Sequence, residues 1–257
     1  MPQVPAADRT LMILLALARS AGPIPAATIA RECQIPKSSL YHLLVAMQAR
    51  GFVTPAGNSM WGLGVSAFEV GSAYIRHEPM ERRARPLLTE AVKKLKRIGA
   101  VVGHVGILRG NDTLYLLKES PSSSITLVTD VGVRLPANLT ASGRAMLAHL
   151  ADSQVKALFP SPSAFTDRTG NGPQNLSALR ALLSLEKSQG YSHEVGFISP
   201  GYSSIACAVF DHLSQPVAAI GITYRDASMS PPHEKSVIKV VQDSAHTLTQ
   251  RIGGHNP

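Results

Sequence analysis

The stretch CQIPKSSLYHLL, residues 33–44, places anion-binding side chains at the start of a helix. Lys37 offers an ammonium group directly after a proline. Hydroxyl groups follow it on Ser38, Ser39 and Tyr41. These groups can donate hydrogen bonds to phosphates or base edges, and the positive end of the helix dipole adds to the attraction. The pattern therefore predicts an anion-binding helix start.

The helix expected over residues 36–50 needs a core that keeps this polar face outward. Its apolar side chains recur at helical spacing, at Leu40, Leu43, Leu44 and Met47. A helix over 9–19 is expected to bury a stripe of Leu11, Leu14, Leu15 and Ala18, and a third short helix fits 26–33. Three short helices with a polar face on the last predict a helix-turn-helix, whose final helix enters the major groove of DNA.

Two short strands, at 52–54 and 60–63, follow that helix around the turn Pro55-Ala56-Gly57-Asn58. A hairpin in this place is the wing of a winged helix. The expected DNA-binding residues are Thr28, Lys37, Ser38, Ser39, Tyr41, His42 and Arg50. The alternative is an ordinary surface face on a three-helix bundle, because serines after a proline are also normal at helix starts.

Charge and composition agree with a polyanionic partner. The chain of 257 residues has a formal charge of +8, and 44% of its residues are apolar, enough for a core. The two cysteines lie far apart, which fits a reducing cytoplasm. The segment 10–18 is too short for a secretory signal, and no apolar run approaches the ~18 residues of a membrane span. We therefore expect a cytoplasmic protein without a membrane partner.

The rest of the chain alternates between helical and strand patterns. Helices are expected over 65–76, 80–98, 141–150, 152–159, 176–189 and 231–252. Strands are expected over 101–108, 113–119, 124–129, 192–198, 203–210 and 216–224. Hairpins with helices between them predict an α+β fold, an α/β sandwich with a mainly antiparallel sheet. The expected domains are a winged helix-turn-helix at 1–64, a linker helix at 65–79 and a second domain at 80–257.

Two of these strands have one bulky face and one small face. The strand over 203–210 alternates Ile205, Cys207 and Val209 with Ser204, Ala206 and Ala208. The strand over 216–224 alternates Ala218, Ile220 and Ile222 with Ala219, Gly221 and Thr223. If the strands pair, their small faces leave room for a small molecule above the sheet. Ser142 and Gly143, at a helix start capped by Thr140, can add N–H groups suited to a carboxylate.

Residues 7–53 resemble the winged-helix half of the IclR (isocitrate lyase regulator) transcription factors. The blocks GVRLPANLTASGRAMLAHL and GYSHEVGFISPGYSSIACAVFDHLSQPVAAIGI resemble parts of that family's effector-binding half. Their order and spacing match across about residues 8–252. The chain departs from the family pattern at His42, where an arginine is usual, and in the wing, which reads Trp61-Gly62-Leu63-Gly64.

The resemblance implies a bacterial regulator that forms a homodimer or a dimer of dimers. Its partners would be double-stranded operator DNA and a small-molecule effector in a GAF-like C-terminal domain. Together with the strand pattern, it implies effector-binding residues at Leu135, Ser142, Gly143, Ser204, Ala206, Ala208, Gly221 and Thr223. Gly221 and Val195 make this site weakly polar, which favours an organic or aromatic acid.

An enzyme is the competing class of function. The sequence has no Gly-x-Ser-x-Gly elbow, phosphate loop, zinc-protease helix or dinucleotide fingerprint, and its nine histidines are scattered. We therefore expect neither catalysis nor a metal or other cofactor. A hydrolase built from His193, Asp211 and either Ser203 or Ser204 remains the alternative.

Overall fold

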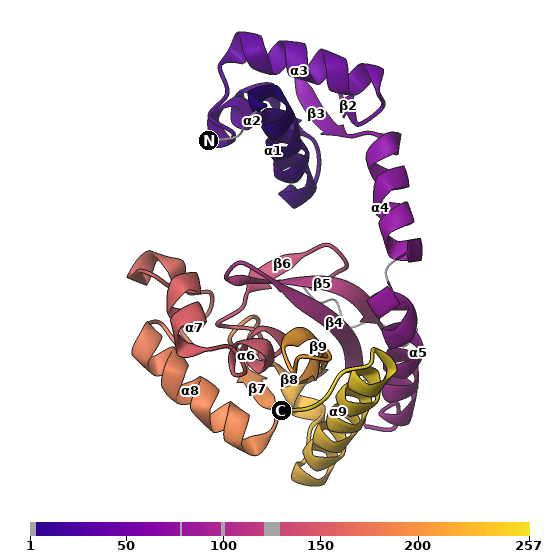
Figure 1. The fold of residues 1–257 in the computed structure, drawn as a ribbon, viewed down its shortest axis with the longest axis vertical. Coiled ribbons are helices and arrows are strands. Elements are labelled where there is room, and N and C mark those ends of the chain that lie inside the picture. The colour runs from indigo at the N-terminus through magenta and orange to yellow at the C-terminus, as the bar shows by residue number, and fades with distance from the viewer. Residues whose placement is uncertain (1–3, 78, 99–100, 121–128) are drawn as a thin grey trace. The chain divides into compact units, whose positions relative to one another are not determined.

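The computed structural model of the chain describes residues 4–77, 79–98, 101–120 and 129–257. The chain divides into two compact units, Met1–Glu78 and Pro79–Pro257 (Figure 1). Each unit has its own hydrophobic core.

The first unit is a winged helix-turn-helix. Its helices are α1 (Pro5–Arg19), α2 (Ala26–Glu32), α3 (Lys37–Ala49) and α4 (Val65–His77). Its small antiparallel sheet has the strand order β1-β3-β2, with β1 (Ile24–Pro25), β2 (Val53–Pro55) and β3 (Met60–Leu63). The predicted wing is therefore confirmed, and β1 adds a third strand that the sequence pattern did not indicate.

The predicted core face of α3 is correct, but of the stripe predicted for α1 only Leu14 packs against the core. Leu40, Leu44 and Met47 of α3 are buried and Leu43 packs against them. On α1 the buried residues are Ile13, Ala16 and Leu17, whereas Leu11 and Leu15 are 59% and 46% exposed. Because α1 carries apolar residues all round, its spacing alone fits two different faces.

The second unit is built on a six-stranded antiparallel sheet of order β6-β5-β4-β9-β8-β7, counted over the described residues. The strands are β4 (Val101–Arg109), β5 (Asp112–Glu119), β6 (Arg134–Pro136), β7 (Ser192–Val195), β8 (Tyr202–Phe210) and β9 (Pro216–Arg225). This confirms the predicted α+β class. The strand expected over 124–129 falls mostly on residues outside those described, β6 was not expected, and β7 ends before residue 198.

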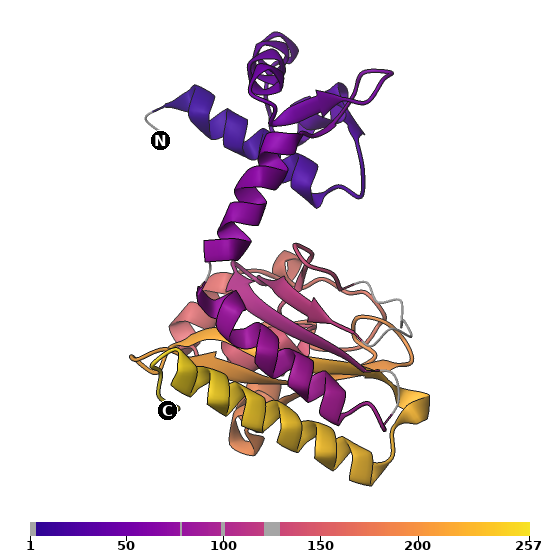
Figure 2. The same ribbon diagram turned by 90° about the vertical axis from the view of Figure 1, so that its right-hand side faces the viewer.

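Helices cover both faces of this sheet. They are α5 (Pro79–Lys94), α6 (Ala141–Leu147), α7 (Asp152–Leu158), α8 (Leu176–Gln189) and α9 (Pro231–Arg251), with short 3-10 turns η1 (Pro162–Ala164) and η2 (Asp226–Ser228). Figure 2 shows α5 and α9 side by side along one face of the sheet. On α9, Val237, Val241 and Leu248 are fully buried and belong to the core under the sheet.

The predicted alternation along β8 and β9 is also confirmed. Ile205, Cys207 and Val209 belong with Ile220 and Ile222 to the core under α5 and α9. Ala206, Ala208 and Ala219 pack instead against Ala141, Ala145 and Met146 of α6. Short side chains on that face let α6 approach the sheet closely, and this places its first turn beside the strands.

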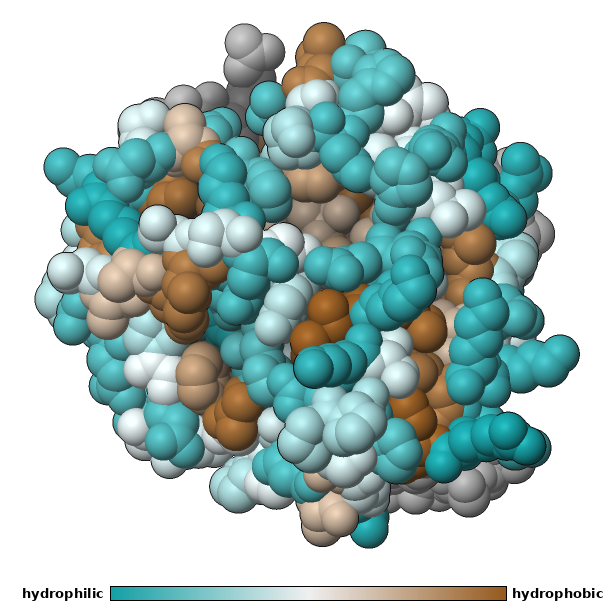
Figure 3. Space-filling model, turned by 90° about the horizontal axis from the view of Figure 1, so that it is seen from below, coloured by the Kyte–Doolittle hydropathy of each residue, from teal (hydrophilic) through white to brown (hydrophobic). Residues whose placement is uncertain are grey.

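No helix of the described chain is long and apolar enough to cross a membrane. On the face drawn in Figure 3, apolar side chains gather in small patches that polar side chains separate.

Candidate functional site

The first turn of α3 is an exposed polar surface. Lys37, Ser38 and His42 are exposed, Tyr41 is 64% exposed, and Ser39 is half-buried. Pro36 occupies the N-cap position, and no side-chain hydrogen bond caps the helix start. The first turn also contains no acidic residue. The N–H groups and the positive end of the helix dipole therefore remain open to an anion.

The wing turn contributes to the same surface. An open cleft of about 480 Å³ runs between α3 and the wing, and Lys37, Tyr41, Asn58 and Trp61 are among the residues along it. Asn58 and Ser59 at the tip adopt left-handed backbone conformations, with φ of 47° and 58°. Asn58, Ser59 and Trp61 were not among the expected DNA-binding residues, although the turn sequence PAGNS marks the position.

Two of the expected DNA-binding residues lie outside this turn. Thr28 is half-buried on α2, next in sequence to Ala27, which lines the same cleft as Lys37. Arg50 is exposed but caps the opposite end of α3, about 20 Å from Lys37 at 1.5 Å per residue. The structure therefore brings Lys37, Ser38, Tyr41 and His42 together at one end and leaves Arg50 at the other.

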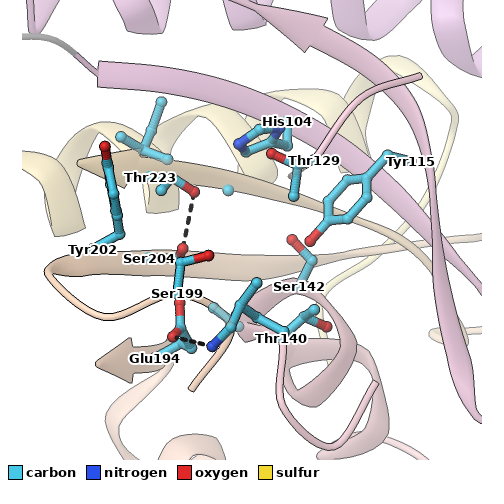
Figure 4. Close-up of a pocket in the computed structure, with 14 residues that line it drawn as sticks. His104, Tyr115, Thr129, Thr140, Ser142, Glu194, Ser199, Tyr202, Ser204 and Thr223 are labelled. Carbon is cyan, nitrogen blue, oxygen red and sulfur yellow. Dashed lines mark hydrogen bonds between the residues drawn. The ribbon is translucent and has the colours of Figure 1, made fainter. Parts of the chain in front are cut away.

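The second unit contains a pocket between its sheet and the start of α6. Antiparallel register determines which side chains meet there, because directly paired residues point to the same face. One row across the sheet is Val102, Thr223, Ser204 and Glu194, on β4, β9, β8 and β7. The next row is Lys118, His104, Gly221, Ala206 and Ser192. Gly221 has no side chain to fill the space above the sheet at its position. The pocket lies there, with His104 and Ser142 among its lining residues (Figure 4).

The opposite wall is the first turn of α6. The Gly143 N–H donates to the Thr140 hydroxyl at 3.0 Å, which confirms Thr140 as the N-cap. That N–H is therefore not free for a carboxylate, contrary to expectation. Burial raises the pKa of Tyr115, whose hydroxyl also hydrogen-bonds to Ser142 and Thr140.

Half of the expected effector-binding residues line this pocket. Ser142, Ser204, Gly221 and Thr223 do, and the Ser204 and Thr223 hydroxyls are 2.8 Å apart. Leu135, Gly143, Ala206 and Ala208 do not line it. A Cβ on Gly143 would lie 2.4 Å from the Ala137 carbonyl oxygen, so this glycine permits close packing rather than ligand access. Ala206 and Ala208 lie under α6.

The sequence pattern missed several lining residues. They are His104 and Tyr115 on β4 and β5, Thr129, and Glu194, Ser199 and Tyr202 around the β7–β8 loop. His104 stands between glycines in VGHVG, which is a detectable sign of an unusual strand. Nothing local, however, places it opposite Gly221, because that pairing spans more than a hundred residues.

Glu194 brings an acidic group to the pocket. Its carboxylate accepts hydrogen bonds from the Phe197 N–H at 2.5 Å and the Ile198 N–H at 3.2 Å. Burial raises its pKa, while these two hydrogen bonds and one from Ser204 oppose the shift. The pocket therefore has hydroxyl groups and one carboxyl group, and no lysine or arginine is among its described lining residues.

A buried arginine lies behind the pocket and supports it. Arg144 of α6 is fully buried and pairs with Glu186 of α8, with its Nε 3.0 Å from one carboxylate oxygen. Its other donors reach the carbonyl oxygens of Asn138, Leu139 and His193. The N–H groups of the Arg144 guanidinium therefore bond to groups of the protein itself. Arg144 thus fixes the position of α6 and does not pair with a ligand.

The hydrolase arrangement is not assembled. The Ser203 hydroxyl donates to Asp226 at 2.6 Å, and the Ser204 hydroxyl pairs with Thr223. Asp211 accepts the N–H groups of Leu213 and Gln215 in the β8–β9 turn, at the far end of β8 from Ser203. Within the described residues these serines therefore bond to no histidine, and the alternative hydrolase triad is not formed.

Two family models match the chain. The model of the IclR helix-turn-helix domain matches residues 6–57, and that of the bacterial transcriptional regulator IclR C-terminal domain matches residues 72–250.

Individual relatives agree with these models. The HTH-type transcriptional regulator BhcR of Paracoccus denitrificans is 28% identical and aligns over 95% of this chain and 86% of its own. The HTH-type transcriptional repressor AllR of Salmonella typhimurium is 26% identical, and the alignment covers 96% of this chain and 90% of AllR. An IclR homologue of Microbacterium hydrocarbonoxydans, solved in complex with 4-hydroxybenzoate, superimposes with a TM-score of 0.78 at 18% identity, over 96% and 99% of the two chains. BhcR and AllR are both named as transcriptional regulators, which agrees with the expectation that the chain is a regulator and not an enzyme.

Proposed function

Because the chain belongs to the IclR family of bacterial transcriptional regulators, we propose that it is a repressor that binds operator DNA and responds to a small effector. Residues 1–64 bind DNA, residues 65–79 form a linker, and residues 80–257 hold the effector. The observation that carries the DNA-binding role is the first turn of α3. It is exposed, uncapped and free of acidic residues, so phosphates and base edges can reach Lys37, Ser38, Tyr41 and His42.

The repressor acts as a homodimer or a dimer of dimers in the cytoplasm. Apolar side chains exposed on the first unit support self-association, since Leu11, Phe68 and Val70 are 59%, 73% and 59% exposed. A dimer places two recognition helices about one DNA turn apart on a pseudo-palindromic operator.

The effector is a small organic or aromatic acid that occupies the pocket beneath α6. The hydroxyls of Tyr115, Ser142, Ser204 and Thr223 supply hydrogen-bond donors for it, and the complex of the Microbacterium relative with 4-hydroxybenzoate supports this class. Without a cation among the described lining residues, such an acid is held by hydroxyls, and its carboxylate lies against those of Tyr115 and Ser142.

The pocket volume connects effector binding to a conformational change. The cavity measures about 30 Å³, room for about two water molecules. A ring-sized molecule therefore has to widen it, and the loop between Gly196 and Gly201 forms part of the wall. An effector that binds the widened form more tightly shifts the equilibrium toward it, which is the differential affinity that regulation requires.

Capture of genomic fragments by the purified protein, followed by sequencing, tests the DNA-binding role. We expect enrichment of a few sites with pseudo-palindromic half-sites. We also expect affinity for those fragments to fall steeply between low and physiological salt, because Lys and Arg contacts to phosphates release counterions. Retention of random fragments only, or an affinity that does not change with salt, would contradict the proposal.

Leucine substitutions at Ser142 and Thr223 test the pocket. Each fills space that the effector occupies and removes a hydroxyl, so we expect effector-induced release of the operator fragment to need at least about tenfold more effector. The measurement is a titration of the captured fragment with candidate acids, including 4-hydroxybenzoate. Ser184→Leu, at an exposed position of α8, is the matched control and should respond as the wild type. An unchanged response in both pocket variants would place the effector elsewhere.

A further inference from the structure

His104 is a buried polar side chain without a hydrogen-bond partner. The residue is 3% exposed, and neither ring nitrogen is hydrogen-bonded within the described residues. A neutral imidazole has one donor and one acceptor, and buried polar groups are nearly always paired. Thr129, which also lines the pocket, has an unpartnered hydroxyl as well. Two unsatisfied groups on one wall of a cavity indicate that a molecule absent from the free protein pairs with them.

The strand register aims this imidazole into the pocket. His104 pairs with Gly221 across β4 and β9, a residue without a side chain, and both residues line the pocket. Figure 4 shows His104 and Thr129 together on the wall opposite Ser142 and Thr140. The nearest aromatic ring, Tyr115, lies 5.3 Å away between centroids at a tilt of 57°, a packing contact rather than a hydrogen bond.

The imidazole is uncharged at physiological pH. Burial lowers the pKa of His104 to about 3, and the charge of Lys118 lowers it further while Asp130 opposes the shift. The other polar groups that line the pocket include the hydroxyls of Ser142 and Thr223 and the carboxyl group of Glu194. Lys118 and Asp130 pair with each other at 3.5 Å, so their charges are directed to one another. A hydroxyl can both donate to and accept from a neutral imidazole, whereas a carboxylate can only accept.

We infer that His104 binds the effector directly and that the group it binds is an uncharged hydroxyl on a small ring, with the Thr129 hydroxyl as second partner. This assignment rests on the proposed effector function and makes it more specific. An acid effector is then oriented with its hydroxyl toward His104 and its carboxylate toward Tyr115 and Ser142. His104 thereby selects hydroxylated rings over otherwise identical rings.

Binding of three probes to the full chain tests the assignment. The probes are 4-hydroxybenzoate, phenol and benzoate, measured by calorimetry with the wild type, His104→Leu and His104→Gln. We expect the wild type to prefer 4-hydroxybenzoate over benzoate by about tenfold, His104→Leu to lose that preference, and His104→Gln to keep most of it. His233→Leu, the same change at an exposed histidine of α9, should bind as the wild type. Equal binding of benzoate, a preference that survives in His104→Leu, or no binding of either hydroxylated probe at millimolar concentration overturns the assignment.

Thermal unfolding of the ligand-free variants separates a binding role from a structural one. His104→Leu removes an unsatisfied buried group, so we expect it to raise the melting temperature by a few degrees. A histidine kept for packing would instead give a lower melting temperature in both His104 variants, and that result overturns the assignment.

Operator titrations distinguish failure of this inference from failure of the proposed function. If the probes bind in a way that depends on His104 but do not affect the operator complex, the ligand site is supported and effector regulation is refuted. Operator release that persists with equal sensitivity in His104→Leu would leave regulation standing and refute the role of His104.

Discussion

Ser38→Glu is expected to weaken operator binding by roughly 100-fold, about 2.8 kcal/mol. Ser38 is exposed in the first turn of α3, where the proposed complex places a phosphate or base edge. A carboxylate there faces the negative charge of the duplex and replaces a donor by an acceptor. The same charge is favourable to the free helix, because acidic side chains stabilise a helix N-terminus. We therefore expect lost binding without lost folding, measured by fluorescence anisotropy with the captured operator and by circular dichroism.

Gln48→Glu is the matched control for this prediction. Gln48 is also exposed on α3, and the substitution changes the charge of the protein by the same amount at the other end of the helix. Because the recognition surface lies at the N-terminal end, we expect its operator affinity to stay within about threefold of the wild type. Equal losses in the two variants would mean that overall charge governs affinity, and they would refute docking through the first turn.

Local sequence patterns were sufficient to predict the recognition helix α3 and the wing, because both depend on contacts between residues close in sequence. The polar and apolar faces of α3 follow from side chains three and four residues apart, and the wing follows from a turn between two short strands. The face of α1 was not predictable in this way, since Leu11, Ile13, Leu15 and Leu17 all satisfy some helical stripe. Only packing against α2 and α3 selects Ile13 and Leu17. Strand β1 was not predictable either, because two residues, one of them a proline, are too few to show the alternation of side chains that marks a strand.

The pocket was only partly predictable because it depends on pairings across the sheet. Alternation along single strands correctly placed Ser204, Gly221 and Thr223 on the face toward α6. Which neighbours complete that face depends on how β4, β5 and β7 register against β8 and β9, and no local pattern encodes that. His104 and Glu194 were therefore missed, although they are the two lining residues whose chemistry most restricts the ligand.

Arg144→Met is expected to destabilise the second unit by about 3–5 kcal/mol, the usual cost of leaving one partner of a buried ion pair alone. Arg144 and Glu186 are 0% and 3% exposed. The substitution keeps most of the side-chain volume, so packing changes little. It leaves the Glu186 carboxylate without its cation and removes the donors to the carbonyl oxygens of Asn138, Leu139 and His193. Urea unfolding of the variant, followed by circular dichroism, measures the loss.

Two further variants show whether charge burial is the cause. Arg180→Met breaks the exposed pair with Asp152 and should cost less than about 1 kcal/mol, because exposed ion pairs contribute little. Adding Glu186→Leu to Arg144→Met removes the stranded carboxylate, so we expect the double variant to recover much of the lost stability. If Arg144→Met costs no more than Arg180→Met, the pair is not what holds α6 against α8. The position of Ser142 in the pocket would then depend on the alanine contacts with β8 and β9 alone.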